Sequence, residues 1–205
     1  MIFLEVLLEG SADQPVVQEI LQRRFRLQEG QHFRIHPHKG KGRLPQYPNN
    51  RPDPKHRGLL DQLPAKLRGY SSLPKGWCVI VLVDADEDDC KELKARMLRL
   101  TPRPRCLLIR IAVEETESWF LADANAIKKA YPKAKLNKLP NTPPDSKIGA
   151  WENLAKTLGK KPQDCTGQDK YEWSTRISPE LNLDSPQSPS LLAFINGVDK
   201  LLSQQ

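Results

Sequence analysis

The fold is decided by one stretch near the middle of the chain, Cys78-Val79-Ile80-Val81-Leu82-Val83-Asp84-Ala85-Asp86. Its apolar part is uninterrupted and rich in β-branched residues, which is typical of a strand covered on both faces in a parallel sheet. The run stops at Asp84, and further acids follow up to Asp89 before a segment of helical composition, residues 90–100. The pattern predicts a buried strand, an acidic turn and a helix.

Similar apolar runs lie on both sides of this stretch. Residues 2–8 end at Glu9-Gly10, residues 106–113 end in the acids of 114–117, and a weaker strand is expected near 32–36. Helical segments are expected at 13–25, 59–67, 119–121, 148–158 and 190–202, the first of them capped by Ser11 or Asp13. This order predicts an α/β fold, a three-layer Rossmann-like domain with a mostly parallel sheet. We place the domain at 1–125 and expect 126–205 to form a helical C-terminal extension packed on the same core.

Length and composition point to a soluble protein. The 205 residues fit one domain of ordinary size with an extension. The amino terminus lacks the basic region and cleavage site of a signal sequence. No apolar stretch approaches the roughly 20 residues that a membrane helix needs. We therefore expect a cytoplasmic protein without membrane contact. The cysteines form no CxxC pair and are expected to be free thiols rather than zinc ligands. They are Cys78, Cys90, Cys106 and Cys165.

The net charge of +7 is concentrated in one segment, residues 34–57, where seven basic residues face the single acid Asp53. The segment is rich in proline and glycine and too poor in apolar residues to form core. A loop of this length in a compact domain is usually functional or disordered. Nucleic acid is the partner we expect, with plain solvated surface as the alternative. The basic residues are Arg34, Lys39, Lys41, Arg43, Arg51, Lys55 and Arg57.

Acidic residues follow three of the expected strands. Glu9, the pair Asp84 and Asp86, and the acids of 114–117 would meet at the carboxyl edge of a parallel sheet, where ligands bind. Carboxylates are the ligands of Mg²⁺ and Mn²⁺. In an extended strand end, residues i and i+2 face the same side, so we expect the carboxylates of Asp84 and Asp86 to reach one ion. The alternative is that such acids cap helices, which we favour for Asp88 and Asp89.

Two motifs together resemble the Toprim domain, which is shared by type IA and type II topoisomerases, bacterial primases, small maturation ribonucleases and OLD-type nucleases. They are Leu7-Leu8-Glu9-Gly10-Ser11-Ala12-Asp13 after the first strand and Asp84-Ala85-Asp86 after the later one. The resemblance implies that Glu9, Asp84 and Asp86 hold Mg²⁺ (or Mn²⁺) and are catalytic. We add Glu117 and, more weakly, Asp88 as further metal ligands. For Glu117 a simple helix-start role is an equal alternative.

The rest of the chain is similar to an uncharacterised bacterial Toprim-like family that is often encoded beside an ATPase in antiphage loci. The residues that carry this resemblance are Glu117-Ser118-Trp119-Phe120-Leu121-Ala122-Asp123, Asp169-Lys170-Tyr171 and Ser188-Pro189-Ser190. It implies an ATPase partner and a role as effector of a bacterial defence system. The chain has no topoisomerase tyrosine domain and no primase zinc ribbon, which leaves nuclease or nucleotidyl hydrolysis.

The preferred hypothesis is a metal-dependent nuclease. Lys170 or Lys147 would stabilise charge on the scissile phosphate, and we count Lys170 among the catalytic candidates. The phosphate backbone would lie along Lys39, Lys41, Arg43, Arg51, Lys55 and Arg57, with Tyr47 stacking on a base. DNA and RNA are equally compatible, and self-association stays open. One alternative is a non-catalytic regulatory subunit. Another is a sugar-nucleotide transferase, in which an apolar-Asp-x-Asp segment holds a metal-bound diphosphate.

Overall fold

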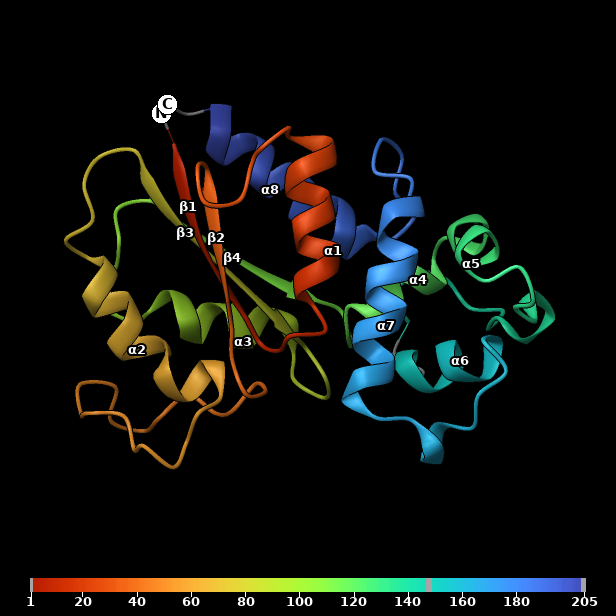
Figure 1. The fold of residues 1–205 in the computed structure, drawn as a ribbon. Helices are drawn as coiled ribbons and strands as arrows, with labels where there is room; N and C mark the ends of the chain where they lie inside the picture. Colours follow the sequence, from red (N-terminus) through yellow and green to blue (C-terminus); the bar gives the residue numbers. More distant parts are fainter. Residues whose placement is uncertain (1, 147–148, 204–205) are drawn as a thin grey trace.

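The sheet is entirely parallel, as the buried apolar runs predict. The computed structural model describes residues 2–146 and 149–203 (Figure 1), and these form one four-stranded sheet in the order β2-β1-β3-β4. Every neighbouring pair is parallel, so all four carboxyl ends lie at one edge. The strands are β1 (Phe3–Leu8), β2 (Phe33–Pro37), β3 (Trp77–Asp84) and β4 (Leu107–Ala112).

Helices follow each strand. The first two connections contain α1 (Gln14–Glu19), which continues as a π-helical turn η1 (Ile20–Arg24), and α2 (Leu59–Tyr70). The next contains α3 (Cys90–Leu98). After β4 come α4 (Glu117–Leu121), α5 (Ala124–Ala130), η2 (Leu136–Lys138), α6 (Ala150–Thr157), η3 (Pro162–Asp164), α7 (Gly167–Ile177), η4 (Ser178–Glu180) and α8 (Pro189–Ser203).

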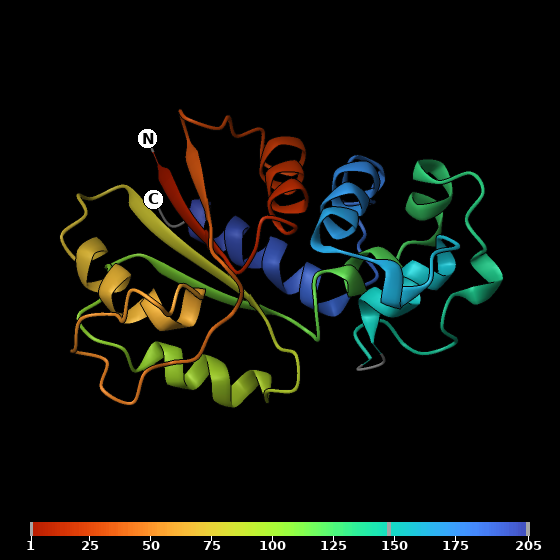
Figure 2. The same ribbon diagram turned by 60° about the horizontal axis from the view of Figure 1, so that its bottom comes forward.

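The sheet is the middle of three layers. Side chains of β1 alternate, so Leu4, Val6 and Leu8 pack in the core cluster that contains α1 and α8, whereas Leu7 packs in the cluster of α2 and α3. Figure 2 shows α1 and α8 on one side of the sheet and α2 and α3 on the other. Because both faces are covered, the strands can be apolar throughout. The predicted three-layer α/β fold is confirmed.

The C-terminal segment divides into two parts. Helices α4 to α7 lie beyond the carboxyl edge of the sheet, and α8 then returns to pack on β4 (Figure 1). Arg110 of β4 contacts this helix, since its Nε donates to the backbone carbonyl of Ala193 over 2.8 Å. A Cβ at Gly197 would lie 2.4 Å from an Arg110 guanidinium nitrogen, so a side chain there would require Arg110 to move. The boundary at residue 125 stays a prediction.

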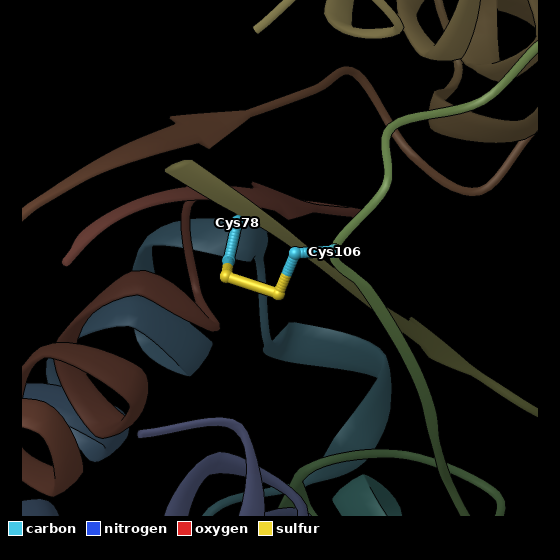
Figure 3. The surroundings of a disulfide bond; sticks show 2 residues. All are labelled: Cys78 and Cys106. Carbon is cyan, nitrogen blue, oxygen red and sulfur yellow. A yellow bond between two sulfur atoms is a disulfide. The ribbon is translucent and has the colours of Figure 1, made fainter. Parts of the chain in front are cut away.

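The expectation of four free thiols is wrong for two of them. Cys78 and Cys106 form a disulfide (Figure 3), whereas Cys90 and Cys165 are free. The reason is the register of the sheet. Val79 of β3 lies opposite Leu107 of β4, so the two preceding cysteines face each other with their Cα atoms 4.7 Å apart. The two cysteines are 28 residues apart in the sequence, and this spacing does not predict that they are close in space.

Within residues 2–146 and 149–203, no helix is long and apolar enough to cross a membrane.

Candidate active site at the acidic edge of the sheet

Glu9 and Asp84 meet where two neighbouring strands end. Leu8 of β1 pairs with Leu82 of β3, so the residues that follow emerge side by side from the sheet. The backbone N–H of Asp84 donates to Glu9 Oε2 over 3.3 Å. Both side chains are partly buried. These two carboxylates come together as the sequence predicts, because parallel neighbours end at the same edge.

Asp86 reaches the same edge by a different route from the one expected. The strand ends at Asp84, and Asp86 lies in a turn with a left-handed backbone, φ 46°. Its N–H donates to the carbonyl of Glu114 over 2.9 Å, and Glu114 is also left-handed, φ 61°. The prediction that Asp84 and Asp86 face the same side of an extended strand is therefore wrong. Two non-glycine residues with positive φ are a local strain of the kind that collects at functional sites.

Lys41 joins the acidic edge to the segment after β2. Its ammonium donates to the carbonyl of Ala85 over 2.7 Å, and lies 3.1 Å from Asp86 Oδ2 and 2.7 Å from Asp88 Oδ2. Its side chain is only 11% exposed. Burial disfavours the charged amine. The hydrogen bonds that Lys41 donates to Asp88 and Asp86 outweigh this burial and raise the pKa of Lys41. Lys41 is thus an internal counter-ion, rather than the free phosphate contact that its position in a basic segment suggested.

Asp13 belongs to this edge, although the sequence suggested a helix cap. It stands at the start of α1 without capping that helix through its side chain. Its carboxylate instead accepts from the N–H of Gly10 over 3.1 Å and from the hydroxyl of Thr116 over 2.7 Å. The side chain is buried, and this burial raises the pKa of the carboxyl. The Gly10-to-Asp13 segment directly after Glu9 was the available signal for it.

Lys170 lies against two acids of the segment after β4. It comes from α7, and its ammonium lies 3.1 Å from Glu115 Oε1 and 3.5 Å from Glu117 Oε1. It also lies 5.1 Å from the centre of the Trp151 ring, whose backbone N–H donates to Glu115 over 3.2 Å. Burial opposes its charge, but Glu117 and Glu115 outweigh burial and raise the pKa of Lys170. Glu115, which the sequence did not single out, is the principal partner of Lys170.

The carboxylates of this edge repel one another. Burial is the main cause that raises the pKa of Glu9 to about 7, and the negative charges of Asp13 and Asp86 add to it. Burial, then Asp13 and Glu9, raise the pKa of Asp84 well above its usual value. Burial followed by Glu117 raises the pKa of Glu115 to about 7. Each shift disfavours the ionised form, first through burial and then through the neighbouring acids, so a cation bound at this edge would favour ionisation of these carboxyls.

The donor set fits a hard divalent cation. It consists of carboxylate oxygens without a cysteine, which suits Mg²⁺ or Mn²⁺ and not zinc. In the described part of the chain, no three His, Cys, Asp or Glu side chains stand close enough together to hold one ion in their present positions. Asp86 and Asp88 are engaged by Lys41. Glu9 and Asp84, which meet where β1 and β3 end, are the two carboxylates that would hold an ion.

The remaining acids have separate roles. Asp89 caps α3, since its carboxylate accepts from the N–H of Glu92 over 2.8 Å, as expected. Asp88 does not cap that helix and is paired with Lys41. Glu117 is the first residue of α4 and is buried, so it combines the helix-start position with contact to Lys170. Lys147 lies outside the described residues.

The basic loop, residues 38–58, begins and ends at the acidic edge. The N–H of Gly40 donates to the backbone carbonyl of Glu9 over 3.0 Å, and the N–H of Leu59 donates to the carbonyl of Gly40 over 2.9 Å. Apart from Lys41, its predicted nucleic-acid contacts point to solvent. The exposed residues are Lys39, Arg43, Arg51, Lys55 and Arg57. The loop that begins beside the acids therefore carries five exposed cations.

Fold and site together define a parallel α/β protein with an acidic carboxyl edge beside a basic loop. Residues 8–199 match the family described as "Domain of unknown function (DUF4276)", and the chain belongs to this family. The match includes the acidic edge, the basic loop and α7. Comparison with curated proteins and with solved structures gave no match.

Proposed function

We propose that this protein is a Mg²⁺- or Mn²⁺-dependent nuclease with a Toprim-like arrangement of its metal ligands. One observation carries the proposal. Glu9 and Asp84 meet at the carboxyl edge of neighbouring parallel strands, and the basic loop is bonded to the backbone of Glu9 at the same point. Carboxylates that suit a divalent cation and a loop of cations that suits a polyanion thus lie at one edge of the sheet, which supports the proposal.

In this proposal the residues of the acidic edge have different roles. Glu9 and Asp84 would hold the cation, which when bound activates water and stabilises the leaving oxygen of a phosphodiester. Asp13 orders the turn after β1 through Gly10 and Thr116. Lys170 fixes Glu115 and Glu117 and lowers the repulsion among the buried acids. It is a positioning residue in this arrangement, because its ammonium is already committed to two carboxylates.

The exposed cations of the basic loop would bind the phosphate backbone. Contacts of this kind position a nucleic acid without reading its sequence, and they weaken strongly with salt. In line with the resemblance to defence-associated proteins, we expect a cytoplasmic protein with an ATPase partner that delivers or licenses the substrate.

A cleavage assay tests the proposal. End-labelled single- and double-stranded DNA and RNA are incubated with the protein in Mg²⁺, Mn²⁺ or EDTA. Asp84→Asn keeps the size of the side chain and removes its charge, and Glu87→Gln makes the same change at an exposed residue of the adjacent turn. We expect metal-dependent cleavage by wild type and Glu87→Gln and at least a hundredfold loss in Asp84→Asn. Equal cleavage by Asp84→Asn and wild type would contradict the proposal.

A regulatory subunit is the second candidate. The observation that favours it is that Lys41 and Lys170 already neutralise part of the acidic edge, as in a site that has become structural. Such a protein would bind nucleic acid or its ATPase partner and would cleave nothing in any metal. Absence of cleavage in the assay above, with salt-sensitive binding retained, would favour it.

A further inference from the structure

The basic loop is folded, although it contains no helix or strand. Arg68 of α2 donates to the carbonyls of Pro48 over 2.6 Å and Asn50 over 3.4 Å. Asp61 of the same helix accepts from the N–H groups of Arg43 and Gly58, each over 3.0 Å. These contacts hold the loop against α2 and fix its shape. A hollow enclosed by the loop is therefore a structural feature rather than a gap in a random coil.

This hollow has the size and the lining of a nucleotide site. Its volume is about 670 Å³, within the usual range for small-ligand pockets. Its lining includes Arg43, Tyr47, Arg51 and His56, together with Gln46 and Asn50 of the loop and Pro64 and Ala65 of α2. Tyr47 is 65% exposed, which leaves its ring open to a partner. An aromatic ring, amides and guanidinium groups are what stacking, base edges and phosphate require.

Two acids, Asp53 and Asp61, also line the hollow, but in the part of the chain that the structure describes neither forms an ion pair with its arginines. Both oxygens of Asp61 accept backbone N–H groups, and Asp53 accepts from the N–H of Lys55 over 2.9 Å. Within the described residues, no ion pair joins Arg43 or Arg51 to a carboxylate. Two guanidinium groups are therefore available to a phosphate, which Arg binds in a bidentate manner.

The hollow lies next to a cleft at the acidic edge. Gly42, Arg43 and Leu44 line the hollow, and the same three residues line the neighbouring cleft that contains Lys41, Asp86 and Asp88. A nucleic acid bound in the hollow would therefore lie close to these acids.

We propose that the hollow binds one unpaired nucleotide, with its base on Tyr47 and its phosphate at Arg43 and Arg51. The substrate is then single-stranded nucleic acid or a single-stranded end, because a base within a duplex would have to leave its stack to enter. This inference deepens the proposed function and rests on it for the role of the acidic edge.

Binding without cleavage tests it. Fluorescence anisotropy in EDTA compares labelled twelve-nucleotide oligo(dT) and oligo(U) with blunt twelve-base-pair DNA and RNA duplexes. We expect single strands to bind at least tenfold more tightly than duplexes. Tyr47→Ala should lose about tenfold or more in single-strand affinity, as removal of a stacking ring does elsewhere. Tyr47→Phe keeps the ring and should bind like wild type. Tyr171→Ala, a matched change at another exposed tyrosine, should also have no effect.

The outcomes separate this inference from the nuclease proposal. Equal affinity for single strands and duplexes, or full binding by Tyr47→Ala, overturns the nucleotide site even if the protein cleaves DNA or RNA. Single-strand preference that depends on the Tyr47 ring supports the site even if cleavage is never observed, since EDTA excludes the reaction.

Discussion

Replacing Glu9 by glutamine should stabilise the protein in the absence of metal. The Glu9 carboxyl is held in a partly buried site beside Asp13 and Asp86, and these surroundings raise its pKa from 4.5 to about 7. Ionisation of Glu9 is therefore unfavourable in the folded protein, whereas in the unfolded chain neither burial nor neighbouring acids oppose it. Glutamine keeps an oxygen that can accept the N–H of Asp84 and has no charge. The substitution should remove the repulsion and keep the contact.

The size and the pH range follow from the pKa difference. A tenfold change in proton affinity is worth ~1.4 kcal/mol, so the rise to about 7 corresponds to about 3 kcal/mol. Well below pH 4.5 the carboxyl is protonated in both the folded and the unfolded state, and wild type and variant should be equally stable. Between pH 4.5 and 7 the unfolded chain ionises first, so wild type loses stability as pH rises. Above pH 7 Glu9→Gln should be more stable by up to about 3 kcal/mol.

Thermal unfolding in EDTA at pH 4.5 and pH 8 measures the effect. For a chain of this length we expect Glu9→Gln to melt on the order of 5–10 °C above wild type at pH 8 and within about 1 °C of it at pH 4.5. Glu87→Gln, an exposed change, should match wild type at both values. Addition of Mn²⁺ should stabilise wild type more than Glu9→Gln. A variant that is no more stable than wild type at pH 8 would refute the electrostatic reasoning.

Three further predictions concern Lys41, the disulfide and salt. Lys41→Met removes the ammonium that engages Asp86 and Asp88, so Mn²⁺ affinity measured by calorimetry should rise about tenfold and trypsin should cut the basic loop faster; unchanged values would mean that Lys41 neither competes for the acids nor anchors the loop. Cys106→Ser opens the 28-residue link to Cys78 and should cost about 3–4 kcal/mol in urea unfolding without reductant. Wild type in reductant should match that variant, and identical unfolding of oxidised and reduced wild type would show that the bond contributes nothing. The logarithm of single-strand affinity should fall with the logarithm of salt at a slope steeper than about −2, given five exposed loop cations; a slope near zero would remove the loop from binding.

The strands and their order along the chain were predictable because local composition determines them. The run Val79 to Val83 could only be a buried strand, and the apolar segments that end at Glu9 and in the acids after β4 repeat that signal. Once the strands were taken as parallel, the meeting of Glu9 and Asp84 followed from topology alone. This part of the site could be predicted from the sequence because it depends only on where the strands end, not on how individual side chains pack.

What the sequence did not reveal depends on contacts between distant elements. Cys78 faces Cys106 only through the register of β3 and β4, and Asp13 meets Thr116 across 103 residues. Asp86 turned away from the expected alternation because its backbone is left-handed, which a period of two cannot show. Lys41 looked like one of several loop cations, and only its position against Ala85 and Asp86 makes it a counter-ion.

An anomalous difference map from crystals grown with Mn²⁺ would show whether Glu9 and Asp84 hold a divalent cation. We expect a peak within about 2.1 Å of a carboxylate oxygen of each residue, absent from Asp84→Asn crystals. Manganese bound elsewhere, or no peak at saturating Mn²⁺, would rule out this metal site and leave the acidic edge as a structural cluster balanced by Lys41 and Lys170.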